Sequence, residues 1–157
     1  FPFILLAMIL ITVLGNGVMN VILAIGIASV PGFARVTRGQ VLIVKEEEYC
    51  NACRVVGVSP VRLLFLHILP NCVSQIIVYA TLRIASAIIS EASLSFLGLG
   101  IALPTASWGS ILRVGRDCLT TAPHVAGTAG AFILVTVIGF NLLGDGIRDV
   151  MDPKMKQ

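Results

Sequence analysis

The stretch FPFILLAMILITVLGNGVMNVILAIGIASVPGFA, residues 1–34, contains no charged side chain. Across all 157 residues, 57% are apolar and only 12% are charged, with a mean hydropathy of +0.98. Soluble domains carry about 25% charged residues. The composition therefore predicts an integral membrane protein and argues against a soluble enzyme.

Further apolar runs indicate how many helices cross the bilayer. Val73–Leu82 and Val125–Leu143 also lack charged side chains, and a spanning helix needs about 20 residues. We predict an all-α, polytopic transmembrane bundle with about four spans, near residues 1–14, 18–33, 71–90 and 125–143. The first residue is not Met, no signal peptide is evident and the first apolar run is already under way. We therefore expect a fragment of a longer protein with an incomplete first span.

Glycine and proline mark the ends of the first two spans. Gly15-Asn16-Gly17 predicts a tight turn, because these residues tolerate positive φ, so the first two spans should form an antiparallel hairpin. Pro31 near the end of the second span is expected to kink or end the helix. Alternatively, the helix continues past Pro31 toward Lys45.

Lys and Arg predict the orientation, because they favour cytoplasmic loops. Residues 35–70 and the C-terminal tail are predicted to be cytoplasmic, whereas Glu91–His124 should lie outside. The basic residues that support this topology are Arg35, Arg38, Lys45, Arg54, Arg62, Arg148, Lys154 and Lys156, against Arg113 and Arg116 outside. The net charge of +3 then reflects topology, and no nucleic acid is expected as a partner.

The cytoplasmic loop 45–71 has the sequence pattern of two short helices. Acidic residues from Glu46 to Glu48 suit a helix start, and Arg54 suits its end. Gly57 predicts a left-handed stop, and Ser59-Pro60 favours a second helix as far as about Leu69. Val61, Leu64, Phe65 and Ile68 recur at helical spacing and predict an apolar face toward a partner or the membrane domain.

This loop resembles the EAA loop of type-1 ABC importer permeases. The matching residues are Glu48, Tyr49, Ala52, Arg54, Gly57, Arg62, His67, Ile68, Leu69, Pro70 and Asn71. Glu91–Gly100 with Ser95, then Pro104, Ser107–Gly109, Phe140–Gly146, Arg148-Asp149 and Asp152-Pro153 are similar to the dipeptide, oligopeptide and nickel branch. Cys50 and Cys53 depart from the pattern, which usually has an aliphatic residue and Ala at these positions.

The resemblance implies the C-terminal portion of a six-span permease in a bacterial or archaeal plasma membrane. Its implied partners are a homologous second permease, two ATPase subunits, an extracytoplasmic solute-binding protein and the lipid bilayer. The ATPase would dock on loop 45–71, with Glu48, Tyr49, Ala52, Arg54, Gly57, Arg62 and Pro70 as its coupling residues. Since the chain has no phosphate-binding loop motif, ATP and Mg would be used by the ATPase, and this chain would hold no cofactor and hydrolyse nothing.

Ionisable residues within the apolar segments are costly and usually contact a cavity or a partner. Glu91, with Ser95, is a candidate for the translocation path, and a structural pairing of Glu91 is the equal alternative. We expect Arg83 to have a structural role and Trp108 to be an interfacial anchor. We expect the last helix to be capped or terminated by Asp145, Asp149 and Asp152, and to end at Pro153.

Cysteine and histidine offer a weaker signal for metal. Cys50 and Cys53 form one C-x-x-C pair, and Cys72 and Cys118 should lie too far apart to complete a site. We expect structural cysteines and no bound metal, with His67 supporting the loop through a hydrogen bond. His124 is predicted on the far side of a span from His67.

The transported solute is left open between dipeptides, oligopeptides, glutathione and nickel. The alternative function is an ion-coupled secondary transporter or a channel, which would need no ATPase. Few intramembrane charges and a glycine-hinged cytoplasmic hairpin favour the externally powered importer.

Overall fold

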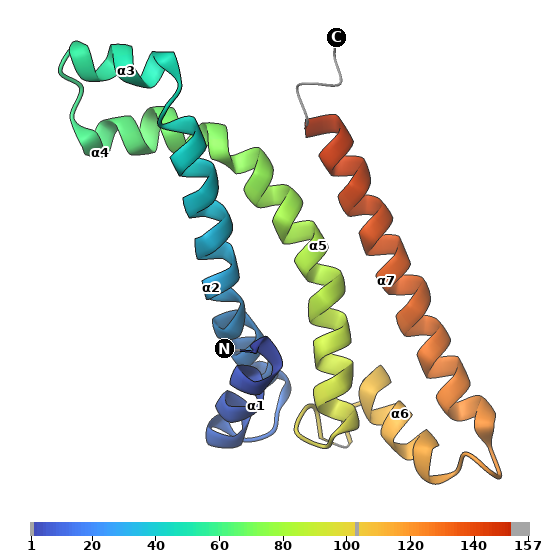
Figure 1. The fold of residues 1–157 in the computed structure, drawn as a ribbon. Coiled ribbons are helices and arrows are strands. Elements are labelled where there is room, and N and C mark those ends of the chain that lie inside the picture. Colours follow the sequence, from blue (N-terminus) through green and yellow to red (C-terminus); the bar gives the residue numbers. More distant parts are fainter. Residues whose placement is uncertain (1, 103, 152–157) are drawn as a thin grey trace. The chain divides into compact units, whose positions relative to one another are not determined.

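The computed structural model describes residues 2–102 and 104–151, and these form helices joined by short turns (Figure 1). In chain order the elements are α1 Phe3–Leu14, α2 Val18–Val44, α3 Glu48–Val55, α4 Pro60–Leu63, the π-helical turn η1 Leu64–Ile68, α5 Leu69–Phe96, α6 Trp108–Asp117 and α7 Pro123–Met151. The described part of the chain contains no strand. The predicted all-α class is confirmed.

Within the described residues, three helical segments are long and apolar enough to cross a membrane. They are α2, the continuous helix Pro60–Phe96 and α7. The first apolar run gives α1, which has 12 residues and is about 18 Å long at 1.5 Å per residue. The described part of the predicted first span is thus too short to cross a hydrocarbon core of about 30 Å.

The turn between α1 and α2 has the predicted glycine geometry. Gly15 and Gly17 adopt φ of 83° and 152°. The Asn20 amide donates hydrogen bonds to the carbonyl oxygens of Leu14 (2.8 Å) and Gly15 (3.1 Å). These bonds satisfy carbonyls that the end of α1 leaves without helical partners.

Pro31 lies inside α2, which continues to Val44. The alternative in which the helix passes Pro31 is therefore confirmed, and termination there is wrong. Tyr79 packs closely beside this proline turn: its ring meets that of Phe33 edge to face with centroids 4.9 Å apart. A Cβ added to Gly32 would lie 2.5 Å from the Tyr79 hydroxyl oxygen, so Gly32 is what admits this contact.

The second helix of the predicted loop does not end near Leu69. It continues through η1 into α5, giving one helix from Pro60 to Phe96. Pro70 lies two residues after the π-helical turn, and proline in a regular α-helix clashes with the carbonyl four residues earlier. A wider turn before Pro70 explains how the helix tolerates it.

The predicted outer loop contains more helix than expected. α5 extends past the predicted end of the third span near residue 90 and contains both Glu91 and Ser95. Trp108 begins α6, which was not predicted. Ser107 caps α6: its hydroxyl accepts from the Ser110 N–H at 3.1 Å, and the Ser110 hydroxyl accepts from the Ser107 N–H at 3.0 Å.

The last helix is also longer than predicted. α7 runs from Pro123 to Met151, so Asp145 and Asp149 lie within the helix and do not terminate it. The predictions that concern Asp152, Pro153, Lys154 and Lys156 lie outside the described residues.

The chain divides into two compact units. Unit 1 comprises residues 1–30 and 82–142, and unit 2 comprises residues 31–81 and 143–157. Unit 1 has an apolar core in which Ala7 and Ile11 of α1 pack with Val21, Ala24 and Ala28 of α2 and with Leu94 of α5. The core of unit 2 supports the helical hairpin formed by α3, its turn and α4.

Candidate functional site

The turn of the hairpin is a Schellman motif with Gly57 at the left-handed position. Gly57 has φ of 84°. Its N–H donates to the Arg54 carbonyl at 3.0 Å, and the next N–H, of Val58, reaches back to Cys53 at 3.0 Å. This is the paired bonding by which a glycine closes a helix C-terminus. The predicted stop at Gly57 is confirmed.

The hairpin is held on a small core made largely of cysteine and aliphatic side chains. Cys50, Leu63, Ile68 and Cys72 are buried in it, and Cys53 packs against it. The Cys50 thiol donates to the Val44 carbonyl at 3.3 Å. Three cysteines therefore contribute to packing, and all four, including Cys118, are free thiols.

The predicted apolar face of the second helix is divided between core and surface. Ile68 is buried as expected, and its buried partner is Leu63. The other three predicted residues of this face are exposed: Val61, Leu64 and Phe65. The π-helical turn explains the change, because its i→i+5 bonding places residues five apart, such as Leu63 and Ile68, on one face. Helical spacing alone did not reveal this register.

Polar side chains join α3 to the helices on either side. Arg54 donates to the Asn51 side-chain oxygen at 2.7 Å and to the Lys45 carbonyl at 3.1 Å. Asn71 donates to the Tyr49 hydroxyl at 3.2 Å and to the His67 carbonyl at 2.6 Å. His67 takes part only through its backbone carbonyl, and its imidazole makes no hydrogen bond to the described residues, so these bonds do not confirm the role predicted for this histidine.

The Tyr49 hydroxyl also donates toward the His67 carbonyl, at 3.5 Å. Burial raises the pKa of the Tyr49 phenol above its ordinary value of 10.0, and the neighbouring Cys50 adds to this shift. The phenol is therefore neutral near pH 7 and retains its proton for this link.

The predicted coupling residues lie on the accessible side of unit 2. Glu48, Tyr49, Ala52, Arg54, Gly57, Arg62 and Pro70 are all exposed. Val55 and Val56 were not predicted as coupling residues, yet their exposed fractions are 89% and 83%. Two aliphatic residues next to the turn glycine were the available signal, since a solvated helix tip has no need of them.

In unit 1, Glu91 and Ser95 lie one helical turn apart and share a hydrogen bond. The Ser95 hydroxyl donates to Glu91 Oε1 at 2.6 Å and accepts from the Ile101 N–H at 3.0 Å. Ser95 is 2% exposed. The structure brings this predicted pair together and links it to the segment after α5.

Arg83 contacts residues of the first two helices. Its guanidinium lies 4.8 Å from the centre of the Phe3 ring, and Nη2 lies 3.5 Å from the Ser29 hydroxyl. Cation–π contacts of this kind stabilise a partly desolvated guanidinium. These contacts support the structural role predicted for Arg83.

Helix α6 packs closely on the end of α5. A Cβ added to Gly109 would lie 2.5 Å from the Ala92 carbonyl oxygen and 2.7 Å from Ser95 Cβ. The Trp108 and Phe132 rings stack with centroids 6.3 Å apart and planes 9° from parallel. Trp108 is therefore fixed in orientation by α7.

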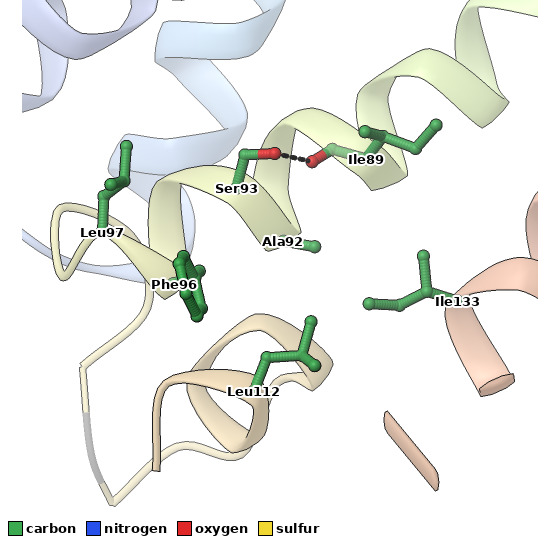
Figure 2. A pocket seen from close by; sticks show the side chains of 7 residues that line it. All are labelled: Ile89, Ala92, Ser93, Phe96, Leu97, Leu112 and Ile133. Carbon is green, nitrogen blue, oxygen red and sulfur yellow. Dashed lines mark hydrogen bonds between the residues drawn. The ribbon is translucent and has the colours of Figure 1, made fainter. Parts of the chain in front are cut away.

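Two of the cavities beside this packing bear on the candidate site. One of about 450 Å³ is lined mostly by apolar side chains of α5, with Leu112 and Ile133 opposite (Figure 2). Its Ser93 hydroxyl donates to the Ile89 carbonyl at 2.7 Å (Figure 2), so its surface is effectively apolar. The second, of about 410 Å³, is lined by Glu91, Ile101, Ala106, Ser107, Trp108 and Ile111.

The His, Cys, Asp and Glu side chains of the described residues do not form a metal centre. Among residues 2–102 and 104–151, no three of them are grouped so that they could hold a metal ion. What the cavities offer instead is one carboxylate beside an indole.

Comparison with known proteins gives a consistent assignment. The family described as "Binding-protein-dependent transport system inner membrane component" matches residues 1–157. The glutathione transport system permease protein GsiD of Salmonella paratyphi A is 51% identical over 156 residues, which are 99% of this chain and 52% of that protein. The proteins of the same name from Salmonella typhi and Escherichia coli O1:K1 are 51% and 50% identical over the same shares.

The chain spans about half the length of these curated relatives. The family match covers both the hairpin and the Glu91–Ser95 segment. The resemblance found in the sequence is confirmed: this chain belongs to the family of binding-protein-dependent transport system inner membrane components, among the ABC importer permeases of the peptide branch.

Proposed function

We propose that this chain forms, with a homologous second permease, the transmembrane path of an ATP-driven importer for short peptides, with glutathione as the first candidate solute. The family match and the name shared by the relatives support this proposal. Nickel and longer peptides have no such support among these relatives.

The hairpin at residues 45–71 is the proposed docking site for the ATPase. The observation that carries this role is the exposure of Val55 and Val56 beside Gly57, at the tip of a hairpin that its own core holds firmly. Exposed aliphatic side chains on an ordered tip are typical of a surface that a partner covers. Glu48, Arg54 and Arg62 would supply the polar rim.

The remaining assembly follows from this docking. Two ATPase subunits would bind and hydrolyse ATP with Mg, and this chain would transmit their movement through α3 and α4. The basic residues favour a cytoplasmic position for residues 35–70 and for the C-terminal end of α7. The segment from Leu97 to Ala122 would then lie outside, where the solute-binding protein delivers its cargo.

Co-purification with the ATPase tests the docking site. We would express the full-length permease pair with its ATPase and compare wild type with Gly57→Asp. Asp tolerates positive φ, and an added Cβ at Gly57 meets no atom within 4 Å, so the hairpin should persist while its tip changes. We expect wild type to retain the ATPase and the variant to lose most of it.

Gly39→Asp is the matched control. Gly39 lies in α2 of the same unit, is exposed and also has no atom within 4 Å of an added Cβ, so it should retain the ATPase. A membrane-inserted wild type that binds no ATPase would reject the importer assignment.

A further inference from the structure

We propose that the cavity between Glu91 and Trp108 binds the ammonium group of the transported solute. This inference rests on the proposed function, because it assigns one contact to a short peptide on its way through the permease. It names a cationic amine as the ligand and the Glu91 carboxylate as its counter-ion.

Glu91 is presented to the cavity in a fixed orientation. Its Oε1 accepts the Ser95 hydroxyl at 2.6 Å, and Ser95 is in turn fixed by the Ile101 N–H at 3.0 Å. A hydrogen bond of this length to a carboxylate is charge-assisted and strong. It also orders the Glu91 side chain, so that this side chain loses less conformational entropy when a ligand binds.

The carboxylate still has acceptor capacity. An ionised carboxylate has about four lone-pair sites and donates nothing. Within the described ranges the ion pairs are Lys45–Glu46 and Arg116–Asp117, so no described side chain forms an ion pair with Glu91. The second oxygen, Oε2, accepts no hydrogen bond from the described residues, and it is not among their buried polar atoms that have no partner. A cation that enters the cavity can reach it.

Trp108 supplies the second element of an amine site. Its indole lines the same cavity and is stacked on Phe132. Tryptophan is the best aromatic partner for a cation, which it attracts when the cation lies within about 6 Å of the ring. A carboxylate and an indole on one largely apolar cavity favour a compact ammonium group over an anion or an uncharged solute.

The cavity volume is compatible with part of a small peptide. About 410 Å³ lies within the usual ligand-pocket range of about 300–1,000 Å³. The competing occupant is a Lys or Arg side chain from elsewhere in the transporter, which would neutralise Glu91 permanently. A Lys or Arg side chain in the cavity would block access of a solute to Glu91. The accessibility of the cavity therefore distinguishes a solute site from a permanent ion pair.

The test measures accessibility in the assembled full-length transporter. Ala106→Cys places a thiol on the cavity, and its rate of modification is measured with a cationic and an anionic methanethiosulfonate reagent, after subtracting labelling of the native cysteines. S-methylglutathione is the probe, because it has a free ammonium and no thiol. N-acetyl-S-methylglutathione, which lacks the ammonium, is its matched control.

We expect the cationic reagent to react several-fold faster than the anionic one, and S-methylglutathione to slow it several-fold. The acetylated compound should have little effect. Glu91→Gln should abolish both the charge preference and the protection, whereas Glu91→Asp should restore part of each. Ala102→Cys, on the neighbouring cavity with Asn16 and Arg113, should show no protection.

Uptake of radiolabelled glutathione by wild type, measured in parallel, tests the proposed function by itself. If wild type transports glutathione but the thiol introduced by Ala106→Cys is unreachable, or both compounds protect it equally, the ammonium site is wrong and the importer assignment stands. Protection that survives Glu91→Gln also rejects the site. Failure of wild-type uptake rejects glutathione as the solute, while ammonium-dependent protection would still support the site.

Discussion

Two helices in this molecule end in the same way, and their surroundings differ completely. Gly57 closes α3 and Gly98 closes α5, each two residues past the last helical residue and each with φ of 84°. Each end has the paired Schellman bonds, which at Gly98 run from its N–H to Ser95 at 3.0 Å and from Leu99 to Leu94 at 2.9 Å. A Cβ at Gly57 would meet no atom within 4 Å, whereas one at Gly98 would lie 2.5 Å from the Arg113 guanidinium.

The Gly57 turn presents a surface, whereas the Gly98 turn anchors one helix on another. The Gly57 turn is supported from within and open outside, as a docking tip should be. The Gly98 turn lies beneath Arg113 of α6, and Asn16 of the first turn reaches its carbonyl at 3.5 Å. Local backbone chemistry is the same, so function depends on what packs against it.

The largest effect should come from Gly109, which seats α6 on the end of α5. In Gly109→Val the new side-chain atoms would overlap the Ala92 carbonyl oxygen, which lies 2.5 Å from the Cβ position. This oxygen belongs to the backbone of α5, so it cannot move away by a change of side-chain rotamer. Overpacking of this kind costs about 1–3 kcal/mol or more. We expect a large fall in the thermal midpoint of the detergent-solubilised permease.

Gly39→Val is the control for the Gly109 variant. An added Cβ at this α2 position meets no atom within 4 Å, so the midpoint should change little. An unchanged midpoint in Gly109→Val would show that α6 is not seated on α5.

Gly98→Ala should have the next largest effect. A non-glycine residue at positive φ costs about 1–2 kcal/mol, and the Arg113 guanidinium must also move. Because that group is the far end of a flexible side chain, Arg113→Ala combined with Gly98→Ala should recover the packing part of the loss. The check is a double-mutant cycle on the thermal midpoint, and strict additivity would contradict the contact.

Local chemistry was predictable from the sequence, and packing was not. The turn at Gly57 was predicted because Gly57 marks the end of one helix and Ser59-Pro60 marks the start of the next. Ser59 stands at the N-cap position, but its side chain makes no capping hydrogen bond. Gly98 was missed because its importance depends on Arg113, 15 positions later in the chain. Likewise, the second loop helix was predicted to end near Leu69, and only the π-helical turn before Pro70 explains why the helix continues.

The candidate site shows the same division. Glu91 and Ser95 were selected as a pair, but their link to Ile101 and the cavity with Trp108 depend on how the segment after α5 folds back. α6 itself was missed because its capping serines, Ser107 and Ser110, stand in a short segment that is rich in small and turn-forming residues. Val55 and Val56 were missed because apolar residues are common throughout this chain.

Gly57→Ala should be milder than Gly98→Ala, because only the backbone term applies. We expect the hairpin to lose about 1 kcal/mol, and Gly57→Asn to lose less, since Asn tolerates the left-handed region. Hydrogen exchange of the α3 amides would report this loss locally. Equal losses for Ala at Gly57 and Gly98 would remove the distinction between an open and a packed turn.

The smallest effect should come from Tyr49→Phe, which removes the hydroxyl that joins α3 to Asn71 and His67. A net hydrogen bond contributes about 0.5–1.5 kcal/mol, and with 39% of the residue exposed we expect the lower end. Burial raises the folded-state pKa of Tyr49 above 10.0, so the folded hairpin binds this proton more tightly than the unfolded chain. Its stabilising contribution is complete below about pH 10 and falls as pH rises through the folded-state value. Hydrogen exchange of the hairpin amides, extrapolated across alkaline pH, should therefore show that wild type loses protection above about pH 10. The Tyr49→Phe variant should not show this pH-dependent loss. If both proteins have the same alkaline profile, the proton linkage belongs to another group.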